Sequence, residues 1–164
     1  MRETRMKSSS LTGKACMKQQ AAVTAIAGVV LCAASGLASA ATEQDVKRIS
    51  IRMGDRTVTA TLNDTEAARD LAAMLPLSIH MRDHMRREKT GPIPRPLSER
   101  TQGSPTYEKG DLGYWRPGGN FVVFYRHDGL TIPSPGIVLL GKIDSGAEVF
   151  DVPGSVDVIV EPIK

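Results

Sequence analysis

The stretch that decides the fold is residues 49–64, which read ISIRMGDRTVTATLND. Apolar and polar residues alternate on both sides of Gly54-Asp55, with the apolar positions at Ile49, Ile51 and Met53 and then at Val58, Ala60 and Leu62. Alternation of this kind is typical of a strand that buries one face. The stretch therefore predicts two half-buried strands joined by a tight turn.

A helix is expected directly after this hairpin, from Asp64 to Leu75. Asn63 and Asp64 offer side-chain oxygens to the first free amides, and Glu66 places an acid in the first turn. Apolar residues then recur at helical spacing, at Ala68, Leu71, Ala72 and Leu75. Pro76 ends the helix, because the residue before a proline disfavours helical backbone.

The remaining chain is rich in strand patterns and lacks an internal repeat. Strands are expected at 77–81, at 112–115 and 121–125 around the turn 116–120, at 137–143 and at 156–161, with a short helical turn at 145–151. Six or seven strands and one main helix predict a mostly β protein, a barrel whose open end the helix covers.

Residues 83–110 stand apart as a long polar segment with four prolines, three glycines and five basic residues in its central part. A compact domain seldom carries so long a loop without a use for it or some disorder. The alternative is a solvated excursion or a loose hairpin. We expect this segment to be the least ordered part of the domain.

The first forty residues read as a cleavable export signal. Five basic residues precede an uncharged apolar run, and Ala38-Ser39-Ala40 supplies the small residues that a signal peptidase accepts. We expect cleavage after Ala40, a linker at 41–47, a single domain at 48–164, and a periplasmic or secreted product. A retained anchor is the alternative, and Met17 is a second possible start of translation.

Removal of the leader changes the charge and the cysteine content. The leader holds five of the 21 Lys and Arg and one of the 18 Asp and Glu, which leaves 16 basic and 17 acidic residues and a net charge of about −1. That balance argues against nucleic acid or a membrane surface as a partner. Cys16 and Cys32 both leave with the leader, which excludes disulfides and thiolate chemistry from the mature chain.

The order of several motifs resembles the bacterial cyclophilin-like family. The matching segments span nearly the whole mature chain: Thr59 to Asp64, Ala72 to Leu77, Glu88-Lys89, Gly110-Asp111-Leu112 and Leu140 to Asp144. The resemblance implies a cyclophilin-type β-barrel with one main helix, in a family whose biochemical function is largely unassigned. The Phe-His-Arg and Gln-Gly-Gly-Asp-Phe-like motifs of the prolyl isomerases of this fold have no recognisable counterpart here.

No catalytic or metal-binding set is readable in the mature chain. His80 and His84 have the spacing of two ligands on one helical face, but they fall on a strand and in the loop after it, and His127 lies in a distant turn. The serines lack a nucleophile-elbow motif and the glycines lack a phosphate-loop motif. We therefore expect no metal and no cofactor, and the catalytic residues remain unknown.

A surface argument supplies the candidate ligand-binding residues, which are Arg82, Met81, Phe124, Tyr125 and Arg126, with Trp115 and Arg116 nearby. Guanidinium groups beside apolar and aromatic side chains at the barrel's edge would bind a peptide or a small acid. The alternative is that the aromatics pack in the core and the arginines are solvated. The expected function is a non-enzymatic peptide- or small-ligand-binding module. A peptidyl-prolyl isomerase is the alternative, and the oligomeric state is left open.

Overall fold

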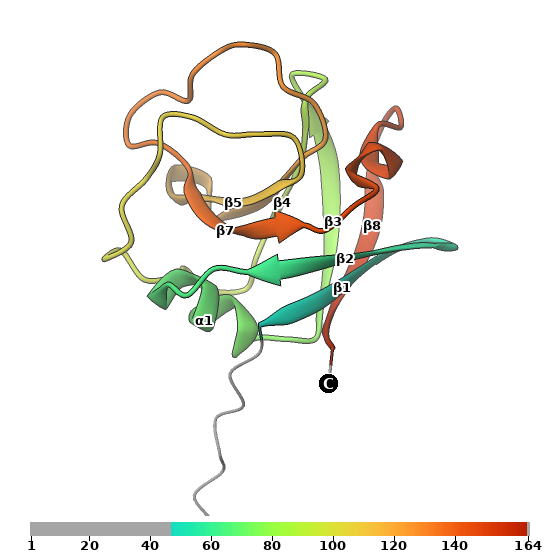
Figure 1. The fold of residues 1–164 in the computed structure, drawn as a ribbon, viewed down its shortest axis with the longest axis horizontal. Helices are drawn as coiled ribbons and strands as arrows, with labels where there is room; N and C mark the ends of the chain where they lie inside the picture. The colour runs from blue at the N-terminus through green and yellow to red at the C-terminus, as the bar shows by residue number, and fades with distance from the viewer. Residues whose placement is uncertain (1–46, 164) are drawn as a thin grey trace, which may run out of the picture. The chain divides into compact units, whose positions relative to one another are not determined.

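The computed structural model describes residues 47–163. Eight antiparallel strands close into a barrel in the order β1-β2-β7-β5-β6-β4-β3-β8 (Figure 1). The strands are β1 (Arg48–Met53), β2 (Arg56–Leu62), β3 (Leu77–His84), β4 (Glu88–Pro92), β5 (Asp111–Trp115), β6 (Asn120–Phe124), β7 (Val138–Ile143) and β8 (Val156–Pro162). The prediction of a mostly β barrel with one main helix is confirmed. The predicted leader at 1–40 and residues 41–46 of the predicted linker lie outside the described residues.

The hairpin β1–β2 forms as the alternation predicts. Ile49 pairs with Ala60 and Ile51 with Val58, and all four side chains are buried. Gly54 takes a φ of 59° in the turn, a left-handed conformation that glycine adopts without steric cost. β1 also pairs with β8 and β2 with β7, so both strands lie inside the closed sheet.

The helix α1 (Glu66–Ala72) is shorter at both ends than the predicted range of 64–75. Its cap is Thr65, whose side chain accepts a hydrogen bond from the Ala68 amide at 3.2 Å. After Ala73 the chain continues through Leu75 in a tight turn rather than as helix. The helix lies across one end of the barrel, where three of its side chains, Ala67, Ala68 and Leu71, join the core (Figure 1).

The expectation that residues 83–110 are the least ordered part of the domain is wrong for residues 83–92, which form a hairpin, the alternative given above. β3 extends to His84, and β4 follows after a three-residue turn, with Arg82 opposite Thr90 and His84 opposite Glu88. The sequence did not favour this hairpin because its residues are mostly charged, and charged residues are normally exposed to solvent. Beyond β4, residues 93–110 form a long connection that is tied to β7 by the bridge between Ser104 and Ile137.

The later elements agree with the predictions. β5 and β6 form the expected hairpin around a 3-10 turn, Arg116–Gly118, and a second short turn, Ala147–Phe150, precedes β8. β8 closes the barrel between β1 and β3, with Val158 and Val160 fully buried. The strand count is eight rather than six or seven, since β4 was not anticipated.

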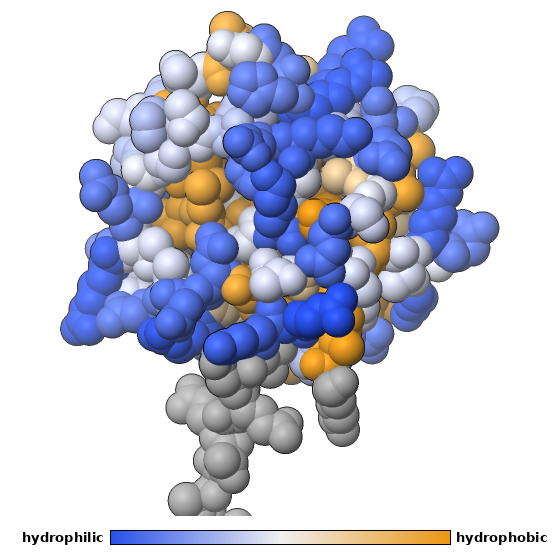
Figure 2. Space-filling view, viewed as in Figure 1, coloured by the Kyte–Doolittle hydropathy of each residue, from blue (hydrophilic) through white to orange (hydrophobic). Residues whose placement is uncertain are grey.

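Apolar side chains form two clusters that lie on opposite sides of the sheet. The larger one fills the barrel, and the smaller one lies outside it against β5 and β6: Tyr107, Val122, Phe124, Ile132 and Ile137. On the face shown in Figure 2, hydrophilic side chains dominate and hydrophobic ones appear in separate patches. Within residues 47–163, no helix has the length and apolar character needed to span a membrane.

Candidate functional site

A pocket of about 350 Å³ lies on the outer face of four neighbouring strands, β3, β4, β6 and β5. Its size falls near the lower end of the range for small-molecule sites. The lining combines six polar or charged residues with an apolar wall. The polar and charged residues are Arg82, His84, Arg87, Glu88, Thr90 and Asn120. The remaining lining residues are Met85, Trp115, Pro117, Gly118, Phe124, Ile132, Pro133 and Ile137.

Strand alternation places the polar side chains of the pocket. On β3, residues 77, 79 and 81 are buried in the barrel, while Arg82 and His84 are exposed on the other face. Their cross-strand partners on β4 are Thr90 and Glu88, and Glu88 is in turn opposite Phe124 on β6. Directly opposed residues on neighbouring strands lie side by side on the same face. Five lining residues therefore come from three adjacent strands.

The apolar wall is the small cluster outside the barrel. The ring of Tyr107 stacks on Phe124 with 4.1 Å between centroids, and Ile132 and Ile137 complete the packing. Gly113 on β5 makes room for this arrangement, since a Cβ there would come within 2.5 Å of Ile137. Trp115 packs against the same cluster and lines the pocket.

An ion network that includes the lining residues Arg87 and Glu88 supports the pocket. Arg87 binds Glu88 Oε2 through Nε at 3.1 Å and Asp128 Oδ2 through Nη1 at 3.0 Å, and Asp128 also accepts the Tyr107 hydroxyl at 2.6 Å. Burial raises the pKa of Glu88, against the opposing effects of Arg87 and His84. The Tyr107 hydroxyl, the Leu130 amide and Arg87 lower the pKa of Asp128 to about 2. The network anchors the loop after β6, which carries Ile132 and Pro133.

Arg82 differs from Arg87 in having no partner. It is exposed on β3, and its guanidinium makes no hydrogen bond or ion pair with any residue in the described range of 47–163. Arg87, by contrast, is almost fully buried and bound to two carboxylates. Arg82 therefore has its guanidinium donors available to a ligand.

The structure brings together two of the five predicted ligand-binding residues. Arg82 and Phe124 line the pocket. Met81 and Tyr125 are buried in the barrel core, since their positions in the chain place them on the inner face. Arg126 follows β6 and pairs with Asp151 at 2.6 Å, without lining the pocket. Of the two nearby candidates, Trp115 lines the pocket, whereas Arg116 donates to the carbonyls of Glu99 and Thr101.

Inside the barrel, Lys89 forms a second charged cluster with Asp83 and Tyr125. Its ammonium contacts Asp83 Oδ2 at 2.8 Å and the carbonyls of Val152 and Gly154 at 2.5 and 2.9 Å, and the Tyr125 hydroxyl donates to the same Asp83 oxygen at 2.6 Å. Burial alone would raise the pKa of Asp83, but the hydrogen bonds from Lys89 and Tyr125 lower it. All three ammonium protons have acceptors, so the cluster joins β3 and β4 to the loop before β8 and takes a structural role.

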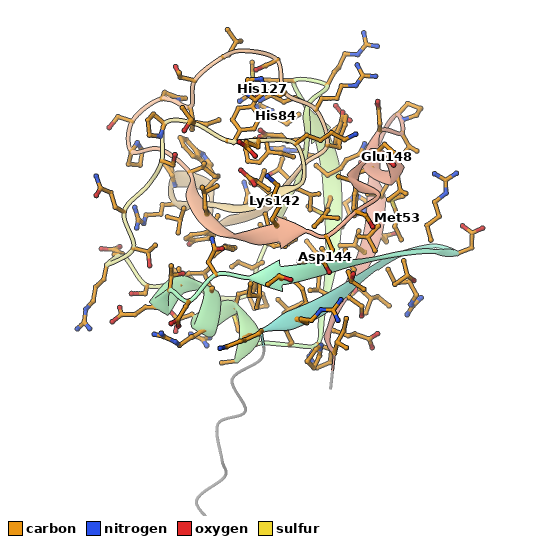
Figure 3. The ribbon with its side chains drawn as sticks, in the orientation of Figure 1. Met53, His84, His127, Lys142, Asp144 and Glu148 are labelled. Atoms are coloured by element: carbon orange, nitrogen blue, oxygen red, sulfur yellow. The ribbon has the colours of Figure 1, made fainter. Side chains whose placement is uncertain are left out.

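The histidines of the described chain, residues 47–163, do not form a common site. His84 and His127 are at the end of the barrel remote from α1 (Figure 3), and His80 binds Asp157 through Nδ1 at 2.7 Å. The His127 ring lies 5.0 Å from that of Tyr107. No group of three His, Cys, Asp or Glu residues within 47–163 is arranged to hold a metal ion.

Several pocket residues were not anticipated from the sequence: His84, Met85, Arg87, Glu88, Thr90, Asn120, Ile132, Pro133 and Ile137. One signal in the sequence could have found His84: it alternates with the inner residues Met81 and Asp83 as Arg82 does, which places it on the same face as Arg82. Glu88 and Thr90 had no such signal, because their inward neighbour Lys89 is charged. Ile132 and Pro133 reach the pocket only through the folding of their loop.

Comparisons with known proteins agree with this architecture. A solved structure, the solution structure of a hypothetical protein from Archaeoglobus fulgidus, is similar with a TM-score of 0.61 and 21% identity. The similarity covers 74% of this chain and 99% of that one. No curated protein matches the chain. The model of the Cyclophilin-like family matches residues 51–161, and the chain therefore belongs to the Cyclophilin-like family.

Proposed function

We propose that the mature chain is a non-enzymatic binding module for a short peptide or a small molecule, held in the pocket on the outer face of β3, β4, β5 and β6. The observation that carries the proposal is the pocket's composition. It combines an apolar wall of Phe124, Ile132 and Ile137 with one exposed cation, Arg82, that has no partner in the described chain. Few convergent polar groups on an apolar surface are typical of ligand sites.

The other charged groups of the pocket already serve the fold. Arg87 and Glu88 bind each other, and Arg87 also binds Asp128, so the three hold the loop after β6 in place. A group engaged in this way keeps a fixed position, and a fixed wall lowers the entropic cost of binding. The proposed binding function is therefore supported by a preformed pocket and not by a set of reactive groups.

Trp115 gives a direct experiment, because it is the sole tryptophan of the sequence and it lines the pocket. Its emission should change saturably when a panel of blocked dipeptides, aryl acids and aryl amides is titrated into the protein. Ile132→Trp, which adds bulk to the pocket wall, should abolish binding in a calorimetric titration of the same probes. A panel that produces no saturable response at millimolar concentration would defeat the proposal.

A prolyl isomerase is a second candidate, favoured by the position of the Arg82 guanidinium beside an apolar pocket. Isomerisation needs no nucleophile, only a slot for the proline ring and a donor that stabilises the twisted amide as its resonance is lost. The uncatalysed barrier is about 18–20 kcal/mol, so partial stabilisation gives a measurable acceleration.

A protease-coupled assay on Xaa-Pro peptides separates the two functions. The binding module predicts no acceleration by the wild type. Acceleration that is lost in Arg82→Ala and kept in Arg52→Ala would establish the isomerase instead. Arg52 is a matched control, since it is an exposed arginine on β1 and does not line the pocket.

We also propose that the module works outside the cytoplasm, as the basic leader, the apolar run and Ala38-Ser39-Ala40 indicate. A periplasmic or secreted location suits a chain whose mature part has no cysteine to oxidise.

A further inference from the structure

We infer that the pocket selects a carboxylate carried on an apolar body, with Arg82 as the residue that binds the carboxylate. The inference rests on the proposed binding function and specifies its ligand class. Three features of the pocket support it: its charge balance, the Thr90 hydroxyl opposite Arg82, and its apolar wall.

The charge balance leaves one uncompensated positive charge in the lining. Four lining residues are titratable or charged, namely Arg82, His84, Arg87 and Glu88. Arg87 and Glu88 compensate each other at 3.1 Å, and Arg87 has a second carboxylate, Asp128, at 3.0 Å, which is not among the residues that line the pocket. Arg82 is the lining residue with a permanent charge that no carboxylate of the described chain compensates, so it gives the pocket a positive sign. That sign favours an anion.

A second donor lies next to Arg82. Thr90 is its directly opposed partner on β4, and the Thr90 hydroxyl makes no hydrogen bond within residues 47–163. Arg116 Nε is the one buried polar side-chain atom in that range without a partner, so the Thr90 hydroxyl must reach solvent, and it does so at the pocket. A guanidinium fork and a hydroxyl side by side match the two oxygens of a carboxylate.

The apolar wall determines what the carboxylate is attached to. Phe124 is fully buried and Ile137 is 2% exposed, so they form the floor of the pocket, and the partly exposed Trp115 flanks them and offers apolar surface to a ligand. A volume of about 350 Å³ accommodates one ring-sized or branched apolar group. Burial of such a group contributes roughly 25 cal/mol per Å² of apolar area, which a purely ionic ligand would forgo.

Such a ligand has two possible sources, a small free acid or the C-terminal carboxylate of a peptide with an apolar last residue. Both present the same chemistry to Arg82 and Thr90. The probes are therefore 3-phenylpropionate for the free acid and acetyl-Ala-Ala-Phe for the peptide terminus, each compared with its own primary amide.

The experiment measures the dissociation constants of the four probes from Trp115 emission, for the folded wild type and its variants. We expect each acid to bind at least tenfold more tightly than its amide, and the difference to shrink as salt is added. Arg82→Ala should remove the preference, Arg82→Lys should retain part of it, and Arg52→Ala should leave it unchanged. Because Arg82 is exposed and unpaired, circular dichroism should show the fold intact in all three variants.

Equal affinity for acid and amide, or a preference that survives in Arg82→Ala, would overturn the inference. Binding of the amides alone would also overturn it while leaving the binding function in place. If none of the four probes binds, and no member of the panel of blocked dipeptides, aryl acids and aryl amides binds either, both the inference and the proposed binding function are contradicted. Tighter binding of the peptide acid or of the free acid assigns the source of the carboxylate, and either result supports the inference.

Discussion

Lys89 shows most clearly how a single residue holds this fold together. Its side chain is fully buried inside the barrel, yet it is charged, and its acceptors come from Asp83 and from two carbonyls of the loop before β8. Its ammonium also lies 5.7 Å from the centre of the Tyr125 ring. A buried charge is tolerated when every donor and acceptor around it is satisfied.

We expect Lys89→Met to lower the free energy of unfolding by about 3–5 kcal/mol, because it removes the cation paired with the partly buried Asp83 carboxylate and leaves two carbonyls without their donor. Chemical denaturation at neutral pH measures the loss. The control is Lys142→Met, since Lys142 is half-exposed and its ion pairs with Glu108 and Asp111 should contribute less than about 1 kcal/mol. Equal losses in the two variants would contradict the role assigned to Lys89.

Asp128 gives a prediction about acid stability. Its pKa is lowered from 3.8 to about 2, chiefly by the Tyr107 hydroxyl, then by the Leu130 amide and by Arg87. A carboxyl whose pKa is depressed by folding stabilises the folded state above its unfolded pKa, and this contribution is lost as the pH falls. The window runs from about pH 4 down to about pH 2.

Asp128→Asn should therefore be less stable than the wild type at pH 7, and the gap should narrow as the pH falls through that window. Thermal unfolding at a series of pH values measures both. Glu88 contributes with the opposite sign, since burial raises its pKa, and the Asp128 charge adds to that rise, so the Glu88 contribution is smaller in Asp128→Asn. A gap that is constant from pH 7 to pH 2 would contradict the prediction.

At the scale of elements, the turn between β3 and β4 is the strained part of the pocket. Met85 and Arg86 take φ values of 53° and 55°, a left-handed conformation in which residues other than glycine are uncommon. Met85 is 56% exposed and lines the pocket, so the strained turn places a flexible apolar side chain at its rim.

Arg86→Gly should raise the free energy of unfolding by up to about 1 kcal/mol, because glycine adopts a positive φ without the steric cost of a side chain. Thermal or chemical unfolding measures the change. The matched control is Arg52→Gly in the middle of β1, where glycine should destabilise by a similar amount. Destabilisation in both variants would show that the Arg86 side chain contributes more than its backbone conformation costs.

For the whole molecule, the predictions concern which part of the chain is the working protein. The barrel closes on itself between β1 and β8, and its described part begins one residue before β1. A chain that starts at Ala41 therefore contains every helix and strand described within residues 47–163. The proposed export signal makes the same division from an independent pattern.

We expect protein recovered from the periplasm or the culture medium of a bacterial host to begin at Ala41. Mass spectrometry of the intact protein and sequencing of its N-terminus measure this. Replacement of Ala38 and Ala40 by large charged residues should block processing and serves as the control. Recovery of the full-length chain in the membrane fraction would favour the retained anchor.

The sequence by itself determined the parts of the fold that rest on hydrophobic periodicity. The strands β1, β2, β5 and β6 and the core positions of α1 follow from apolar residues at strand or helix spacing, because one face of each element is buried. The cyclophilin-like type of the barrel came instead from the resemblance of several motifs to that family. It also placed Arg82 and Phe124 among the candidate ligand-binding residues.

Only the tertiary structure decided the rest of the pocket. β4 carries Glu88 and Lys89, which read as exposed, and they are buried because Arg87, Asp83 and the loop carbonyls lie close enough to satisfy them. Met81 and Arg82 are neighbours in the chain but lie on opposite faces of the sheet, one in the core and one at the pocket. Such partners come from distant segments, and charge compensation between them leaves no periodic trace in a single sequence.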